Sequence, residues 1–294
     1  MSYELSVYEK NAIQSIFEWK NPPVTWWTKT TGAISKPFNF VGDLFTKVPG
    51  VDWVLEKSVG GLVDLLNDFA HWSVRPEAIY KEYRAAGHAT VKTPQDIFKL
   101  DLEDADKVNG YLGAKYKSLA AAEGAAAGSV GLVGIAPDIV AIIALNQRAI
   151  AEYATYFGFD ISSQQERLFA LNILGYASSP DDLAKQVAMA QLVKIGQDVA
   201  KKKTWKVLEQ HTFVQIIQTI AKSLGIRLTK AKLAQVVPAT GAIVGGGFNA
   251  YYTSKVCDTA YYLYRERFLA EKYGADIIDS SVAPADSIIP DYQD

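Results

Sequence analysis

Disulfide partners, an excess of charge and a strongly apolar run of membrane-spanning length are all missing from this sequence of 294 residues. Its single cysteine, Cys257, excludes an internal disulfide and a zinc site built on several cysteines, and it fits a reducing, cytoplasmic compartment. The formal net charge of −2 provides no global field that would recruit nucleic acid. Residues 1–20 contain no long apolar stretch, so we expect no secretory signal there.

Motifs for catalysis and for cofactors are missing as well. The three histidines are far apart in the chain, and none stands in a metal-binding pattern. No glycine run is followed by Lys-Ser or Lys-Thr at phosphate-loop spacing, and no GxSxG nucleophile elbow occurs. Cys257 lies in an apolar helical pattern, where a place in the core is the simpler interpretation. We therefore expect no cofactor and no metal, and the sequence identifies no reaction.

The pattern that is present is helical. Apolar residues from Leu5 to Trp19 and from Val51 to Phe69 recur at the spacing of one helical face. Thr93 before Pro94, and Ser163 three residues before Glu166, are typical of helix N-termini. Since no convincing alternating strand is found, we predict an all-α fold with a single multi-helix domain. Left-handed glycines are predicted to end helices at Gly87, Gly158 and Gly225.

Two glycine-rich apolar stretches, 114–158 and 233–254, are predicted to form central helices. A proline–aspartate pair interrupts the first, and glycines and hydroxyl side chains dilute the second, so neither is expected to span a bilayer. Their small residues recur four positions apart, which lets two helices approach closely. Either the stretches pack on each other as buried helices, or they dock on a membrane. The helix-packing candidates are Gly124, Gly128, Gly241 and Gly245.

The domain organisation follows from composition. Residues 1–50 hold one helix and a segment rich in tryptophan and proline, and residues 51–274 form the main helical domain. Residues 275–294 carry five aspartates and no basic residue, which is typical of a solvated tail.

Several segments in order resemble the EcsC family. The match runs from about residue 5 to residue 274 and includes Tyr264-Arg265-Glu266-Arg267. The resemblance implies a helical protein that accompanies a membrane complex such as an ABC exporter, in a secretion process. It supplies no catalytic residues. Other matching segments are Thr93–Leu102, Ala122–Gly128, Ala136–Ile150, Tyr156–Asp160, Glu166–Leu171 and Val237–Ala242.

Polar residues inside apolar helices are the candidates for a site. Because buried charges must be paired or hydrogen-bonded, they predict a structural network, for example Asp138 or Glu166 with Arg148 or Arg167. The alternative is a polar pocket that serves a ligand or a reaction. The six candidates are Asp138, Asn146, Arg148, Glu166, Arg167 and Asn249.

Positive charge is concentrated between residues 201 and 232, directly before the uncharged stretch 233–254. Basic residues beside an apolar segment suit an anionic membrane surface, although a solvated lysine face is the plainer interpretation. Aromatic residues do not alternate with these lysines, so nucleic acid is not expected as a partner. The candidates for membrane contact are Trp26, Trp27, Lys201, Lys202, Lys203, Lys206, Lys222, Arg227, Lys230 and Lys232.

These patterns favour a peripheral, amphitropic membrane-associated accessory protein at the inner face of the membrane. Two other functions stay open at this point. One is a ligand-binding protein or hydrolase-type enzyme with a buried polar pocket, and the other is a soluble interaction scaffold.

Overall fold

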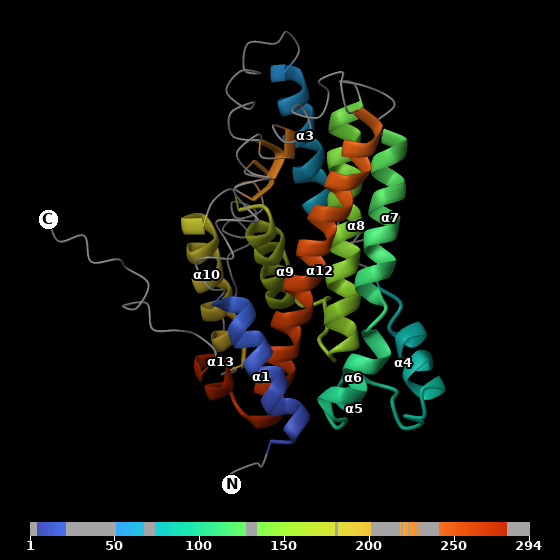
Figure 1. Ribbon diagram of the computed structural model, residues 1–294, viewed down its shortest axis with the longest axis vertical. Coiled ribbons are helices and arrows are strands. Elements are labelled where there is room, and N and C mark those ends of the chain that lie inside the picture. The colour runs from blue at the N-terminus through green and yellow to red at the C-terminus, as the bar shows by residue number, and fades with distance from the viewer. Residues whose placement is uncertain are drawn as a thin grey trace, which may run out of the picture.

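The computed structural model describes residues 5–21, 51–67, 74–127, 134–179, 182–200, part of 218–229, and 241–280. Within these ranges every regular element is a helix and no strand occurs, so the predicted all-α class is confirmed (Figure 1). The helices are α1 (Val7–Lys20), α3 (Val51–Asn67), α4 (Pro76–Ala85), α5 (Pro94–Ile97), α6 (Leu102–Asn109), α7 (Leu112–Ala127), α8 (Ile135–Tyr156), α9 (Gln164–Ala177), α10 (Asp182–Ala200), α12 (Gly241–Tyr273) and α13 (Asp276–Ser280).

Helix α12 is the axis of the molecule. It is 33 residues long and contacts α1, α6, α7, α8, α9, α10 and α13. Figure 1 shows it running along the long axis, with α7 and α8 on one side and α1 and α9 on the other. Helix α13 extends the packed part of the chain beyond residue 275, because Ile278 is buried there.

Among the described helices, α7 and α12 have the most extensive contact. Helix α7 is rich in alanine, and both Ala120 and Gly124 are buried, so short side chains allow the two backbones to approach. Gly241 and Gly245 belong to α12, but their surroundings, like Gly128 itself, lie outside the described residues.

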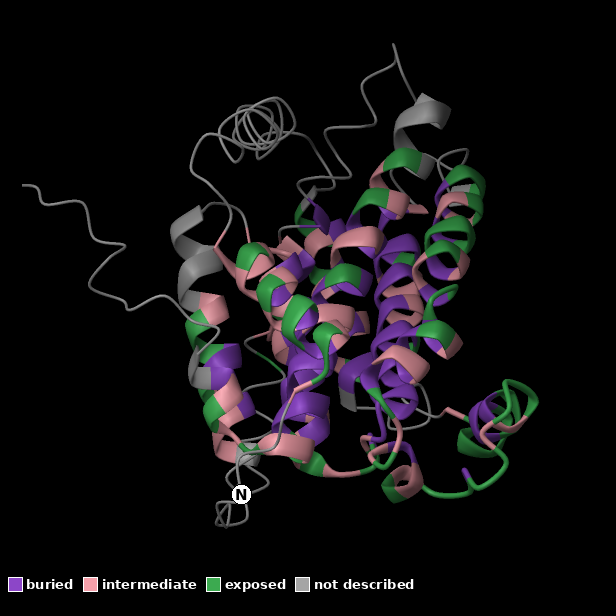
Figure 2. Cartoon of the chain, turned by 60° about the horizontal axis from the view of Figure 1, so that its bottom comes forward, coloured by how far each residue is buried: buried purple, intermediate pink, exposed green. Residues whose placement is uncertain are grey.

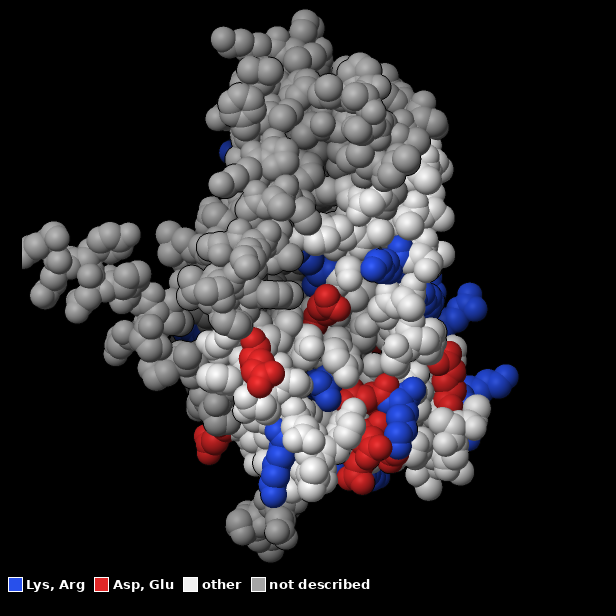
Figure 3. All heavy atoms as spheres, in the orientation of Figure 1, with Lys and Arg blue, Asp and Glu red and all other residues white. Residues whose placement is uncertain are grey.

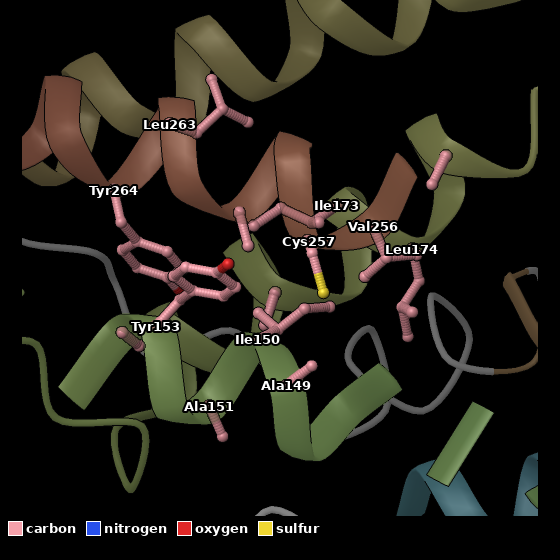
Figure 4. Close-up of a cluster of buried hydrophobic side chains, with 14 of the residues drawn as sticks. Ala149, Ile150, Ala151, Tyr153, Ile173, Leu174, Val256, Cys257, Leu263 and Tyr264 are labelled. Atoms are coloured by element: carbon pink, nitrogen blue, oxygen red, sulfur yellow. The ribbon is translucent and has the colours of Figure 1, made fainter. Parts of the chain in front are cut away.

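The core follows α12 along its length (Figure 2). Large aromatic side chains fill it, and Tyr83, Tyr156, Tyr264 and Phe268 are almost completely inaccessible to solvent. Figure 4 shows the Cys257 thiol pointing from α12 toward Ile150 on α8, among other apolar side chains. Burial raises the pKa of Cys257 to about 12, so the thiol is a core group and not a ready nucleophile.

Local signals in the sequence set several helix ends. Helix α5 starts at Pro94 as predicted, and Ser163 accepts a hydrogen bond from the Glu166 N–H at 3.2 Å. Gly87 and Gly158 have positive φ angles of 103° and 83°, as predicted for helix ends. The prediction for Gly225 was wrong, because it lies in a helical segment where an added Cβ would meet Val59 Cγ2 at 2.7 Å.

A matched pair of glycine variants tests these assignments. Gly158→Ala should lower the free energy of unfolding by about 1–3 kcal/mol, because the backbone is left-handed there. The new Cβ would also lie 2.9 Å from the Pro94 carbonyl oxygen. Gly247→Ala should instead raise the free energy of unfolding by about 0.5–1 kcal/mol, since this α12 position is helical and no atom lies within 4 Å of the new Cβ. Chemical denaturation measures both, and equal effects would contradict the assignment.

Candidate functional site

Three consecutive charged residues of α12 are buried: Arg265, Glu266 and Arg267 are 5%, 2% and 3% exposed. Successive residues of an α-helix point about 100° apart, so these three side chains leave the helix in different directions. Each of them reaches a different helix, and each meets a partner of opposite charge there. We call these three residues the α12 triplet.

The partners of the α12 triplet come from α6, α1 and α9. The Arg265 guanidinium contacts Asp106 on α6 at 2.8 Å. Glu266 accepts from the Lys20 ammonium of α1 at 2.5 Å through both carboxylate oxygens. Arg267 donates to both oxygens of Glu166 on α9, at 2.6 and 2.5 Å.

Additional contacts offset the cost of removing these charges from water. The Arg267 guanidinium stacks on the rings of Phe159 and Phe169, 4.2 and 4.5 Å from their centroids. Burial disfavours the charge of Arg267, yet the Glu166 carboxylate raises its pKa above the ordinary value. Burial lowers the pKa of Lys20 even though Glu266 acts in the opposite direction.

A second cluster lies at the end of α12. Glu9 accepts hydrogen bonds from the Tyr273 hydroxyl at 2.8 and 2.9 Å and pairs with Lys272 at 3.3 Å. Its carboxylate also accepts from the Ser6 N–H, which completes a capping box at the start of α1. Burial opposes the charge of Glu9, but these hydrogen bonds and Lys272 outweigh it and lower its pKa. Glu9 thus joins the start of α1 to the end of α12.

Polar residues in the other half of α12 make side-chain hydrogen bonds to α8. Asn249 donates to Asp138 Oδ1 at 3.1 Å, and Asn146 donates to Thr253 Oγ1 at 3.1 Å. Asp138, Asn146 and Asn249 from the sequence prediction therefore lie in buried polar contacts between these two helices.

The expected partners of Glu166 are elsewhere. Arg148 lies at the surface, where its side chain is 57% exposed and reaches Glu152 at 3.5 Å. Arg167 is half-buried and donates to the backbone carbonyls of Ile161 and Ser162. The residue that pairs with Glu166 is Arg267, which is 101 residues away in the sequence. Of the six candidates, Arg167 lines one of two hollows in the described part of the chain, and the other five line neither of these two.

Most candidates for membrane contact lie outside the described residues. Lys222 is described and is exposed. Trp26, Trp27, Lys201, Lys202, Lys203, Lys206, Arg227, Lys230 and Lys232 fall in the ranges that the structure leaves undescribed, so their role stays a prediction.

The structure exposes apolar side chains that the sequence reasoning missed. Trp53 on α3 is 47% exposed, Leu119 on α7 is 48% and Tyr251 on α12 is 38%. All three lie in helices that reach the upper end of the molecule in Figure 1. Helical spacing alone did not reveal them, because each belongs to a pattern that also supplies core residues.

The upper parts of α7, α8 and α12 are poor in charge, whereas α3 beside them carries Asp52, Glu56, Lys57 and Asp64. The segments 118–127 of α7, 135–147 of α8 and 241–254 of α12 contain only Glu123 and the buried Asp138 as charged residues. On the face drawn in Figure 3, the described surface at the upper right is uncharged, and most of the visible acidic and basic side chains gather lower down. We call this region the uncharged end.

An apolar groove of about 770 Å³ opens between α3 and α8 at the same end. Trp53, Leu65 and Val140 line it, and Lys57 and Asp64 lie at its border. Gly61 is required there, because an added Cβ would meet Val140 Cγ2 at 2.7 Å.

Within the described ranges, no group of three or more acidic, histidine or cysteine side chains is placed to hold a metal ion. In the same part of the chain, no helix is both long and apolar enough to cross a membrane.

Comparison with known proteins gives a family and two relatives. The sequence profile of the EcsC protein family matches residues 54–269. The protein EcsC of Bacillus subtilis (strain 168) is 25% identical over 206 residues, which is 69% of this chain and 80% of that protein. The uncharacterised protein YdbA of the same strain is 26% identical over 228 residues, which is 74% of this chain and 79% of that protein. No solved structure matches the chain.

The buried pair of Glu166 and Arg267 can be tested by neutralising its acid. Glu166→Gln should lower the free energy of unfolding by about 3–5 kcal/mol, because Arg267 keeps its charge without a counter-charge. Glu103→Gln is the control, since Glu103 pairs with Lys107 at the surface and its loss should leave stability nearly unchanged. Denaturant titration measures both, and a Glu166 variant as stable as the control would contradict the assigned role.

Proposed function

The chain belongs to the EcsC protein family, and from that premise we propose that it is a peripheral membrane-associated protein that docks its uncharged end on the membrane. The observation that carries this proposal is the position of Leu119 and Tyr251. Both are exposed, and both lie on helix segments that are almost free of charge. The two side chains lie on helices that contact each other, α7 and α12, and contiguous exposed apolar surface marks an interaction site.

The chemistry of this end suits the interface of a bilayer. Tyrosine and tryptophan, represented here by Tyr251 and Trp53, are favoured at the level of the lipid headgroups. The Lys255 ammonium lies 4.5 Å from the centroid of the Tyr251 ring, so a cation accompanies the aromatic group. Each lysine near an anionic surface contributes roughly 1 kcal/mol of attraction. The neighbouring groove between α3 and α8 adds apolar surface at the same end.

Peripheral docking also agrees with the composition of the described helices, since α8 and α12 are long enough to cross a bilayer but not apolar enough. No described helix is suited to span the bilayer, so contact with the membrane would be made by a surface. The partner that the resemblance implies, a membrane complex such as an ABC exporter, would be reached from this position. That partner and the secretion process remain part of the proposal.

Flotation with vesicles tests the docking surface. The protein should float with vesicles of phosphatidylcholine and phosphatidylglycerol at low salt and float less at high salt. Leu119→Glu combined with Tyr251→Glu should reduce the floating fraction at least about tenfold, because two apolar contacts of about 1.5 kcal/mol or more are replaced by charges.

Val7→Glu is the matched control, because Val7 is 75% exposed but lies at the start of α1, at the other end of the molecule. It should float as the unaltered protein does. If the double variant floats as well as this control, the uncharged end is not the docking surface. No flotation of the unaltered protein at either salt concentration would contradict membrane docking altogether.

A further inference from the structure

A cleft of about 450 Å³ opens at the end of the molecule opposite the uncharged end. It lies between α4, α5 and the turn that joins α8 to α9, which are at the bottom of Figure 1. Its volume is within the range of about 300–1,000 Å³ that small-molecule sites occupy. Val74, Pro76, Pro94 and Phe159 supply an apolar wall.

The turn beside the cleft is held in one conformation. Gly158 has φ of 83°, and its backbone approaches the Pro94 carbonyl so closely that a Cβ would lie 2.9 Å from that oxygen. Asp160 Oδ1 accepts from the Ser162 N–H at 2.9 Å. Arg167 donates to the carbonyls of Ile161, at 3.3 Å, and Ser162. A site with such fixed walls loses little conformational freedom when a ligand binds.

Two opposite charges border the cleft. Arg167 is half-buried on the first turn of α9, and Asp160 is exposed in the turn. The two groups are near enough to interact electrostatically, since Asp160 favours the charged form of Arg167 while burial disfavours it and lowers its pKa. A ligand with a single charge would be attracted by one of these groups and repelled by the other.

Tyr80 is the third polar group of the cleft. The residue as a whole is 5% exposed, but solvent in the cleft reaches its hydroxyl oxygen, which makes no hydrogen bond to any residue that the structure describes. A hydroxyl that faces the solvent of a cleft and has no protein partner can donate a hydrogen bond to an external acceptor. The carboxylate oxygen of a ligand is such an acceptor, and Arg167 presents its guanidinium to the same cleft.

We propose that this cleft binds a small zwitterion with an apolar side group, of the kind represented by a free amino acid. The ligand carboxylate contacts the Arg167 guanidinium and the Tyr80 hydroxyl, and the ammonium contacts the Asp160 carboxylate. The side group packs on Pro76, Pro94 and Phe159. The binding is non-covalent and leaves every group in its ordinary charge state. It goes beyond the membrane docking proposed above and uses none of the residues of the uncharged end.

Isothermal titration calorimetry with three probes tests the ligand class. L-Phenylalanine has both charges, N-acetyl-L-phenylalanine lacks the ammonium, and L-phenylalaninamide lacks the carboxylate. The full-length protein should bind L-phenylalanine saturably and bind each blocked compound at least about tenfold more weakly, because a charge-assisted hydrogen bond is lost. No binding of L-phenylalanine, or equal binding of all three compounds, would overturn the proposal.

Variants locate the site. Tyr80→Phe removes a hydroxyl without internal hydrogen bonds, so the fold should persist while affinity for L-phenylalanine falls about fivefold. Arg167→Gln should weaken L-phenylalanine binding at least about tenfold. The variant should then bind L-phenylalanine and L-phenylalaninamide with similar affinity. Arg148→Gln is the control, since Arg148 is an exposed arginine that does not line the cleft.

The control should bind as the unaltered protein does. Unchanged affinity in Tyr80→Phe would place the ligand elsewhere, even if Arg167→Gln proved too unstable to assay. Vesicle flotation of Tyr80→Phe should be normal, so a failure of the cleft and a failure of membrane docking give different results.

Discussion

The burial of three neighbouring charges on α12 is the constraint on which the described structure depends. Arg265, Glu266 and Arg267 each find a counter-charge on a different helix, at 2.5 to 2.8 Å. A buried ion pair stabilises a fold little compared with well-packed apolar residues. A fold that buries the two charges apart from each other, however, is less stable by several kcal/mol. The α12 triplet therefore determines which helix lies on which side of the axis, and the aromatic core fills the space between them.

This constraint divides the molecule into two ends of different character. Ion pairs and hydrogen bonds tie α1, α6 and α9 to the C-terminal part of α12. The N-terminal part of α12 meets α8 and α7 through short side chains and hydrogen bonds such as that of Asn249 with Asp138, with no ion pair among the described contacts there. In the charged half, Glu166, the partner of Arg267, directly precedes the cleft residue Arg167 on α9, and the uncharged half leaves Leu119 and Tyr251 at the surface. The two proposed activities accordingly lie at opposite ends.

Local rules recovered the class and much of the fold from the sequence. Caps at Thr93 and Ser163 and the left-handed Gly158 depend on neighbours a few residues away, which a sequence displays directly. The partner of Glu166 could not be found this way, because Arg267 is remote in the chain and its proximity depends on how α9 packs on α12. The sequence does show three consecutive charges between apolar residues of a long helix. If that helix is buried, each of these charges needs a buried counter-charge.

The central claim is that each charge of the α12 triplet holds one particular helix, and hydrogen exchange in Glu266→Gln tests it most directly. The Lys20 ammonium would keep its burial and lose its counter-charge, so the account predicts that amides of α1 lose protection first. Amides of α9, which Arg267 holds through Glu166, should keep theirs. Uniform loss of protection along the chain, or unchanged protection in α1, would contradict the claim.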